Sequence, residues 1–317
     1  MRRTSVRLAL LVVAALLVPA CSSLESSPDA APSDSGSAVP RGTLQVAAYN
    51  FGESQLVANL YAGALNAAGH PAEVKTLTNR EIIVPALEKG DVQVVGDYAG
   101  TLTEYLNKQV NGPDAPAKAS SDLDTTMRAL RELAAQEELV VLDPAEARNQ
   151  NAFAVTKQFA AEHDLKTLSD LAAYSQQNPV TLGGPPECPK RPFCQQGLEN
   201  TYGLNVKDFR SLDAGGPLTK SALKQGVVDV GLVLTSDGAL DQFGLVILED
   251  DKNLQASDNI VPVLNQDASD KAVDDTLNAV QAKLTTQALQ DMNYSVDWER
   301  QDPEKVAEAW LTLNGLA

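Results

Sequence analysis

Apolar and polar positions along residues 44–142 alternate between the period of a strand and the period of a helix. Leu44, Val46 and Ala48 share one face of a period-2 pattern, which predicts a strand, and an apolar helical stripe then runs from residue 56 to residue 68. The alternation continues with strands predicted at 73–77, 92–96 and 139–142 and helices at 80–89 and 122–136. Such alternation predicts an α/β architecture with parallel sheets and ligand crevices at the carboxyl ends of the strands.

A short segment occurs twice in the chain. Residues 86–94 read ALEKGDVQV and residues 222–230 read ALKQGVVDV, and each copy predicts a helix end, a glycine stop and a buried strand. The second copy lies among a further predicted strand at 152–155 and helices near Ser169 and over 197–202. The repeat predicts two similar α/β lobes, with the residues after the two copies facing each other across a cleft.

The last part of the chain predicts a strand over 260–264 and then helices as far as Leu316. If this part returns to the first lobe, the chain crosses between the lobes twice, and two crossings form a hinge. We therefore expect residues 44–149 and 257–317 to form lobe I and residues 150–256 to form lobe II.

The beginning of the chain predicts export. Arginines at positions 2, 3 and 7 precede an apolar run that ends at Val18, which is the pattern of a signal peptide over residues 1–20. The sequence before Cys21 approximates a bacterial lipobox, so we expect Cys21 to carry a lipid anchor. The alternative is ordinary signal cleavage that leaves Cys21 free or removes it. Residues 21–43 are rich in Ser, Asp, Pro, Ala and Gly and predict a flexible tether.

Charge and composition narrow the function classes. The 42 acidic residues outnumber the 25 Lys and Arg residues, which gives a net charge of −17. This balance argues against nucleic acid as a partner and against direct binding to anionic lipid. No apolar stretch after Val18 has membrane-spanning length, and no Gly-x4-Gly-Lys-Ser/Thr phosphate loop occurs. Any importer that this chain serves must therefore be built from other chains.

Cys188 and Cys194 are the two cysteines that follow Cys21. In an exported chain we expect such a pair to form a disulfide, with a metal site or a redox pair as the alternatives. His70 and His163 are distant in sequence, and neither Gly-x-Ser-x-Gly nor His-Glu-x-x-His occurs. We therefore expect no catalytic residues, no metal and no cofactor, and we do not expect an enzyme.

Several ordered motifs resemble the glycine betaine/choline-binding components of ABC importers. The first is NFGES at residues 50–54, directly after the first predicted strand. Others, at similar spacing, are TNRE at 78–81, GDYAGT at 96–101, GGPPE at 183–187, GGPLT at 215–219 and LEDD at 248–251. The resemblance extends from about residue 44 to the C-terminus. It implies a type II two-lobed periplasmic-binding-protein fold that closes on a quaternary ammonium solute and serves separate permease and ATPase subunits.

A trimethylammonium group has no hydrogen to donate, so aromatic faces must select it by cation–π attraction. Tyr98 and Phe51 are the aromatic candidates, and core packing is the alternative for each. Asp97 either complements a cation or caps the next helix, and Gly183 and Gly184 permit close backbone approach. The expected ligand-binding residues are Asn50, Phe51, Ser54, Thr78, Asn79, Asp97, Tyr98, Thr101, Gly183, Gly184, Thr235, Ser236 and Asp237.

The second lobe departs from the family pattern. Leu234 stands where an aromatic cage residue is expected, and Phe153, Phe193 and Tyr202 are not placed to replace it. The predicted aromatic box is therefore incomplete. A sugar, a polyol or a phenolic glycoside is the alternative ligand, and a sensory or scaffolding lipoprotein is the alternative function. In the main interpretation the protein is a monomer, held by its lipid anchor at the outer face of the cytoplasmic membrane.

Overall fold

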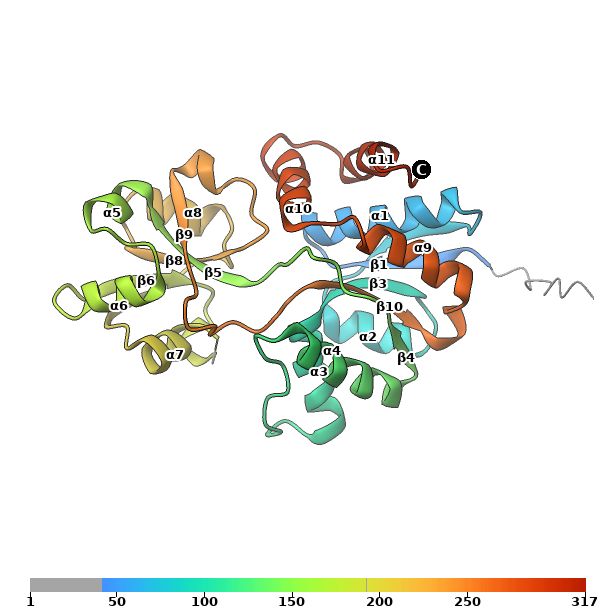
Figure 1. The fold of residues 1–317 in the computed structure, drawn as a ribbon, viewed down its shortest axis with the longest axis horizontal. Helices are drawn as coiled ribbons and strands as arrows, with labels where there is room; N and C mark the ends of the chain where they lie inside the picture. Colours follow the sequence, from blue (N-terminus) through green and yellow to red (C-terminus); the bar gives the residue numbers. More distant parts are fainter. Residues whose placement is uncertain (1–41, 192) are drawn as a thin grey trace, which may run out of the picture. The chain divides into compact units, whose positions relative to one another are not determined.

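The computed structural model describes residues 42–191 and 193–317. The predicted signal peptide, Cys21 and the tether as far as Arg41 lie outside the described residues. The described part contains two five-stranded sheets with helices packed around them (Figure 1). None of its helices combines the length and the apolar character that a membrane crossing requires.

The first sheet has the strand order β2-β1-β3-β10-β4. Its strands are β1 (Leu44–Ala48), β2 (Ala72–Thr76), β3 (Val94–Tyr98), β4 (Leu139–Val141) and β10 (Ile260–Asn265). The helices around it are α1 (Gly52–Ala67), α2 (Arg80–Glu88), α3 (Ala99–Asn111), α4 (Leu123–Ala134), α9 (Lys271–Gln281), α10 (Thr286–Asn293) and α11 (Pro303–Leu313). We call this sheet with its helices the first lobe.

The second sheet has the order β7-β6-β8-β5-β9. Its strands are β5 (Asn151–Thr156), β6 (Val180–Gly184), β7 (Val206–Ser211), β8 (Val230–Leu234) and β9 (Leu245–Leu248). Its helices are α5 (Lys157–Glu162), α6 (Leu168–Ser175), α7 (Gln195–Gly197) and α8 (Pro217–Lys224). Short helical segments complete the described chain: η1 (Ala135–Glu137), η2 (Cys188–Lys190), η3 (Leu198–Tyr202), η4 (Leu240–Phe243), η5 (Gln266–Ala268) and η6 (Tyr294–Trp298). We call the second sheet with its helices the second lobe.

Both sheets are mixed, whereas the sequence pattern predicted parallel sheets. Strands β1, β2 and β3 pair in parallel, as do β6, β7 and β8, but β10 and β5 run antiparallel to both of their neighbours. The reason is the connectivity. Each of these two strands enters its sheet from the other lobe, so the helical crossover that enforces parallel pairing within one sheet is absent there. The α/β fold with two similar lobes is confirmed.

The chain passes between the lobes twice, as predicted, once between β4 and β5 and once between β9 and β10 (Figure 1). The two connecting segments lie side by side, because Arg148 and Asn259 form an antiparallel bridge. The backbone N–H of Asn149 also donates to the carbonyl of Asp258 at 3.0 Å. Paired segments of this kind form a hinge about which two lobes can close.

The repeated segment occupies the same place in each lobe. Gly90 follows α2 and Gly226 follows α8, with φ of +75° and +69°. Each glycine N–H donates at 3.0 Å to a helix carbonyl three residues earlier. Strands β3 and β8, which come next, are both the third strand in their sheet order. The left-handed conformation that ends both helices explains why glycine stands at both positions.

We expect Gly226→Ala to lower the free energy of unfolding by about 1 kcal/mol, because a side chain in the left-handed region costs about 1–2 kcal/mol. A Cβ at Gly226 would meet nothing within 4 Å, so the effect isolates the backbone. Gly42→Ala is the control, since a Cβ there also meets nothing within 4 Å and its φ is not left-handed. Urea unfolding measures both, and equal effects would contradict the assignment.

Candidate functional site

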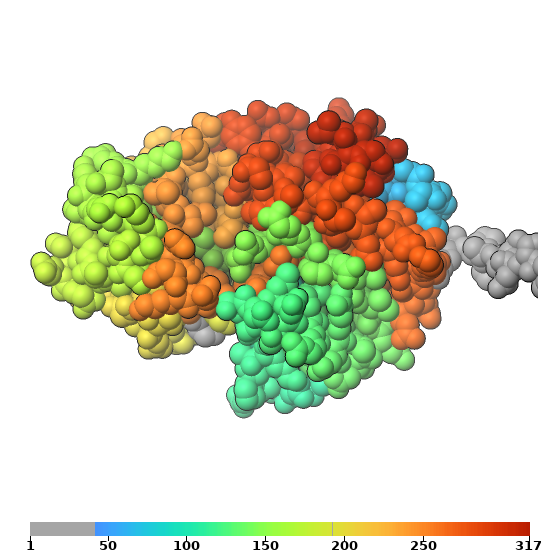
Figure 2. All heavy atoms as spheres, in the orientation of Figure 1, coloured from blue at the N-terminus to red at the C-terminus, as the bar shows by residue number. Residues whose placement is uncertain are grey.

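A cavity of about 640 Å³ lies between the two lobes. Its first wall contains Phe51, Gly52, Glu53, Asn293, Asp297, Trp298 and Arg300 of the first lobe and Asn149 of the first crossing. Its second wall contains Ala214, Gly215, Gly216, Pro217, Lys220, Leu234, Ser236, Asp237, Ala239 and Phe243 of the second lobe. The lobes touch beside this cavity at the upper edge of Figure 2, where α10 meets the segment after β8. The cavity is therefore built from segments that the sequence separates widely.

Three aromatic side chains line the cavity: Phe51, Phe243 and Trp298. Phe51 and Trp298 are 42% and 45% exposed, although large apolar side chains are usually buried. Phe51 stacks on Tyr49 and on Tyr98, with ring centroids 6.0 and 6.4 Å apart. Phe243 meets Trp298 edge to face at 5.6 Å. Aromatic rings therefore face the cavity from both walls.

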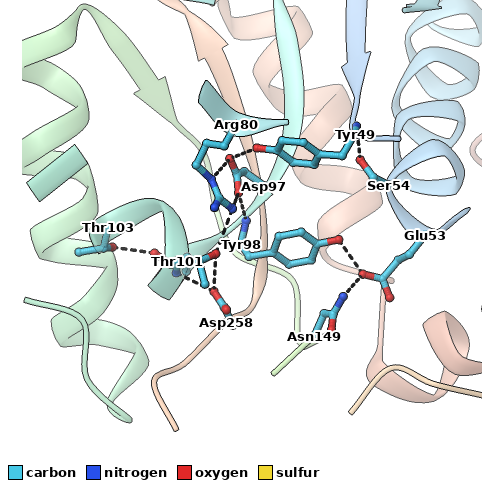
Figure 3. Close-up of polar contacts among 11 residues, drawn as sticks. Tyr49, Glu53, Ser54, Arg80, Asp97, Tyr98, Thr101, Thr103, Asn149 and Asp258 are labelled. Atoms are coloured by element: carbon cyan, nitrogen blue, oxygen red, sulfur yellow. Dashed lines mark hydrogen bonds and ion pairs between the residues drawn. The ribbon is translucent and has the colours of Figure 1, made fainter. Parts of the chain in front are cut away.

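Asp97 is fully buried near the end of β3. Arg80 at the start of α2 compensates it through Nη2 to Oδ1 at 2.6 Å and Nε to Oδ2 at 3.2 Å (Figure 3). The hydroxyl of Tyr49 and the backbone N–H of Tyr98 also donate to this carboxylate. Burial, followed by the charge of Asp97, raises the pKa of Tyr49 well above its usual value. Both carboxylate oxygens of Asp97 thus accept hydrogen bonds from groups of the protein itself. Two of these groups belong to Tyr49 and Tyr98, on which Phe51 stacks.

Glu53 is 5% exposed, in the first turn of α1, and it connects four segments of the chain. Tyr98 donates its hydroxyl to Glu53 Oε1 at 2.7 Å, and Asn149 donates its amide to the same oxygen at 2.5 Å (Figure 3). Asn293 at the end of α10 donates to Oε2 at 2.6 Å and to the carbonyl of Ser236 at 3.0 Å. Burial and the neighbouring Glu53 raise the pKa of Tyr98 well above its usual value, so its hydroxyl remains a donor.

The second wall carries a compensated charge pair. Lys220 Nζ lies 2.6 Å from Asp237 Oδ2, with side chains only 10% and 12% exposed. The same ammonium lies 5.7 Å from the ring centroid of Phe243. Burial raises the pKa of Asp297, while Lys220 and Arg300 act in the opposite direction. This end of the cavity therefore holds positive as well as negative groups.

The structure brings part of the predicted site together. Phe51, Ser236 and Asp237 line the cavity, and Tyr98 lies behind Phe51. Asp97 does not line it. Thr235 lies in the hinge region, where its hydroxyl accepts from the N–H of Gln150 at 2.9 Å and donates to the carbonyl of Arg148 at 3.1 Å.

The other predicted residues lie away from the cavity lining. Asn50, Thr78, Asn79 and Thr101 are exposed. Ser54 is buried and accepts from the N–H of Tyr49 at 2.8 Å, and Thr101 Oγ1 accepts from Arg80 at 3.0 Å. Gly183 and Gly184 lie inside the buried strand β6, where a Cβ on Gly183 would meet Leu212 and Val228. Their small size serves sheet packing.

Sequence reasoning missed several lining residues, namely Phe243, Trp298, Lys220, Asn149 and Asn293. Leu234 does line the cavity, and Phe243, nine positions later, supplies the second-lobe aromatic face that the sequence pattern lacked. Phe153 is 1% exposed in the core, and Tyr202 donates to Asp250 at 2.5 Å. Among these missed residues, Trp298 had one sequence signal, because it is a tryptophan within a polar segment.

Cys188 and Cys194 form a disulfide in the core of the second lobe. Both side chains are buried, and the bond closes the loop that follows β6. Among the residues that the structure describes, no group of three or more His, Cys, Asp or Glu side chains is arranged to hold a metal ion.

Comparisons with known proteins agree with this geometry. Residues 42–312 match the family model described as the substrate binding domain of ABC-type glycine betaine transport system. The glycine-betaine-binding protein of Pseudomonas aeruginosa is 29% identical over 285 residues, which are 86% of this chain and 88% of that protein. The carnitine transport binding protein OpuCC of Listeria monocytogenes is 24% identical over 288 residues, 86% of this chain and 87% of that protein. A solved structure described as a glycine betaine/carnitine/choline ABC transporter has a TM-score of 0.73 at 25% identity and covers 86% of this chain and 99% of that chain.

We expect Arg80→Ala to lower the free energy of unfolding by about 3 kcal/mol or more, because it leaves the charge of Asp97 buried and uncompensated. Lys271→Ala is the control, since it breaks an ion pair with Asp275 whose side chains are 86% and 63% exposed, and it should cost less than about 1 kcal/mol. Urea unfolding at neutral pH measures both. Similar losses in the two variants would contradict the role given to Arg80.

Asp258 gives the stability a specific dependence on pH. It lies on the second crossing, 9% exposed, and accepts from the N–H of Thr101 at 2.9 Å. Burial raises its pKa to about 6 from 3.8. The folded state therefore holds this proton more tightly than the unfolded state, so the contribution is present at low pH and is lost as pH rises from about 4 to about 6. The free energy of unfolding of Asp258→Asn, relative to that of the wild type, should therefore increase by about 1–3 kcal/mol as the pH rises from 4 to 7. Urea unfolding at both pH values measures this, and a difference that does not change with pH would contradict it.

Proposed function

The chain belongs to the family of substrate-binding domains of ABC-type glycine betaine transport systems, and from that premise we propose that it captures a small quaternary ammonium solute in the cavity between its lobes. The family resemblance inferred from the motifs is confirmed by the match over residues 42–312. The relatives named above are described as binding or transporting glycine betaine, carnitine or choline, which share a trimethylammonium group. Members of this family are extracytoplasmic solute-binding proteins that work with permease subunits.

The observation that carries the proposal is the set of aromatic faces in the cavity. Phe51 and Trp298 are each more than 40% exposed and open into a space bounded by both lobes. A trimethylammonium group is held by aromatic faces within about 6 Å of the ring centroid, and the attraction reaches about 2 kcal/mol when water is excluded.

The cavity also suits the second charge that glycine betaine and carnitine carry. Lys220, Arg300, Gly215 and Gly216 line it. A carboxylate tail would find its partners among these groups, while the ammonium end takes the aromatic wall.

In the mechanism that we propose, the solute enters between the lobes and the lobes close about the paired crossing segments. Contacts that join the lobes are already present on one side of the cavity, where Gln290 donates to the carbonyl of Thr235 at 2.7 Å. Closure excludes water from the cavity and so strengthens the cation–π attraction. The closed protein then docks on a permease formed by other chains, which are energised by an ATPase.

We further propose the arrangement of the whole chain. Residues 44–149 and 257–317 form lobe I and residues 150–256 form lobe II, in keeping with the strands of each sheet. Residues 1–20 are a signal peptide, Cys21 carries the lipid, and residues 21–43 tether a monomer to the outer face of the cytoplasmic membrane. The support is the lipobox-like sequence before Cys21 and the polar composition that follows it.

Titration calorimetry with choline, glycine betaine and carnitine tests the proposal. We expect binding of at least one of them, and we expect Trp298→Leu to weaken it about tenfold because an aliphatic side chain keeps the apolar contact but loses the cation–π term. Trp310→Leu is the matched control. That residue is the other tryptophan, on α11, and it packs against the first-lobe core outside the cavity.

Two outcomes would contradict the proposal. Folded wild-type protein that binds none of the three amines at millimolar concentration would exclude the quaternary ammonium class, and binding of sugars, polyols or phenolic glycosides instead would support the alternative. Equal affinity losses in Trp298→Leu and Trp310→Leu would remove Trp298 from the site.

A further inference from the structure

Glu53 is a buried carboxylate that has no positive partner among the residues that the structure describes. Its three hydrogen-bond donors, the hydroxyl of Tyr98 and the amides of Asn149 and Asn293, are all neutral. Within residues 42–191 and 193–317, no Lys, Arg or His forms an ion pair with it, whereas Asp97 is paired with Arg80 and Asp237 with Lys220. Both Glu53 oxygens accept, which is the pattern of an ionised carboxylate. A charge in that position is costly unless something compensates it.

The N-terminus of α1 offsets this charge only in part, because a helix end provides about half an elementary charge. Asn149 and Asn293 each turn Nδ2 toward Glu53, and each has a buried Oδ1 with no donor in the described part of the chain. Asn293 is 5% exposed, and both asparagines line the cavity together with Glu53. One carboxylate and two unpartnered amide oxygens thus collect on one wall.

An aromatic face belongs to the same wall. Phe51 precedes Glu53 by two residues, lines the cavity and stacks on Tyr98, whose hydroxyl donates to Glu53 (Figure 3 shows this bond). Hydrogen bonds and ring stacking therefore connect the carboxylate and the ring face across α1, β3, the first crossing and α10. A compact monovalent cation satisfies both, because the carboxylate supplies a full charge and the ring accepts the methyl surface.

We propose that Glu53 is the counter-charge for the ligand's ammonium group and the residue that distinguishes this cation from a neutral molecule of the same shape. This inference rests on the proposed function and adds to it. The aromatic rings hold an apolar body of the right size and attract it further when it is a cation, whereas Glu53 responds to the charge alone.

The test pairs each amine with its uncharged-head carbon isostere. Choline is compared with 3,3-dimethylbutan-1-ol and glycine betaine with 3,3-dimethylbutanoate, by calorimetry on wild type and on Glu53→Gln. Glutamine keeps the shape of the side chain and a carbonyl acceptor but removes the charge. We expect the amine to lose affinity at least about tenfold in Glu53→Gln while the isostere changes less than about threefold. Glu81→Gln, an exposed carboxylate of α2 outside the cavity, should leave both unchanged.

The outcomes separate this inference from the function on which it rests. A wild type that binds an amine which Glu53→Gln binds equally well overturns the role of Glu53 and leaves the proposed function standing. Equal losses for amine and isostere also overturn it, because they indicate a change of shape. A wild type that binds none of choline, glycine betaine and carnitine overturns both proposals.

A measurement on the wild type covers the case in which Glu53→Gln does not fold, as judged by circular dichroism and its unfolding transition. The wild type should then prefer the amine over its isostere by at least about a hundredfold, since both the carboxylate and the rings favour the charge. A preference below about threefold overturns the assignment without any variant.

Discussion

The carboxylate of Asp97 is buried where the central strand of the first sheet ends, and a charge in that position has to be compensated within the protein. Arg80 does so from the first turn of α2, and the hydroxyl of Tyr49 and the N–H of Tyr98 take the remaining acceptor positions. These contacts connect the first turn of α2 to the end of β3 and hold the hydroxyl of Tyr49 and the backbone of Tyr98. Because Phe51 stacks on both tyrosines, the cavity's aromatic wall depends on this one buried charge.

The two lobes share one arrangement of strands, and this arrangement determines where a ligand can bind. Each sheet receives its antiparallel strand from the other lobe, so the two connecting segments must lie together, and they do so at Arg148 and Asn259. The segment that follows β8 then lines the space between the lobes through Ser236 and Asp237. On the second wall Lys220 and Asp237 form an ion pair, while Glu53 on the first wall has only neutral hydrogen-bond donors in the described part of the chain and lies beside aromatic rings. The chemistry of the cavity is thus divided between its walls.

More of the architecture than of the candidate site could be predicted from the sequence. The period of the apolar positions and the glycines that end helices predicted most helices and strands. The two copies of the repeated segment, with Gly90 and Gly226, predicted the two similar lobes. These signals lie within short stretches of sequence. Phe51 and Asp237 reach the cavity as predicted, since both come shortly after strands that end at the cleft. Phe243 and Trp298 could not be found in that way. They reach the cavity through η4 and the segment after α10, and only tertiary packing decides which face of such segments is open. Gly183 and Gly184 illustrate the converse, since a motif glycine can serve strand packing alone.

The most direct test of the account is a crystal structure of the protein with the quaternary amine that it binds most tightly. The account predicts the ammonium nitrogen within about 6 Å of the Phe51 ring centroid, with Glu53 as the nearest carboxylate and the lobes closed over the ligand. A ligand in any other cavity, or an ammonium group that faces Lys220 with its other end toward Glu53, would contradict it.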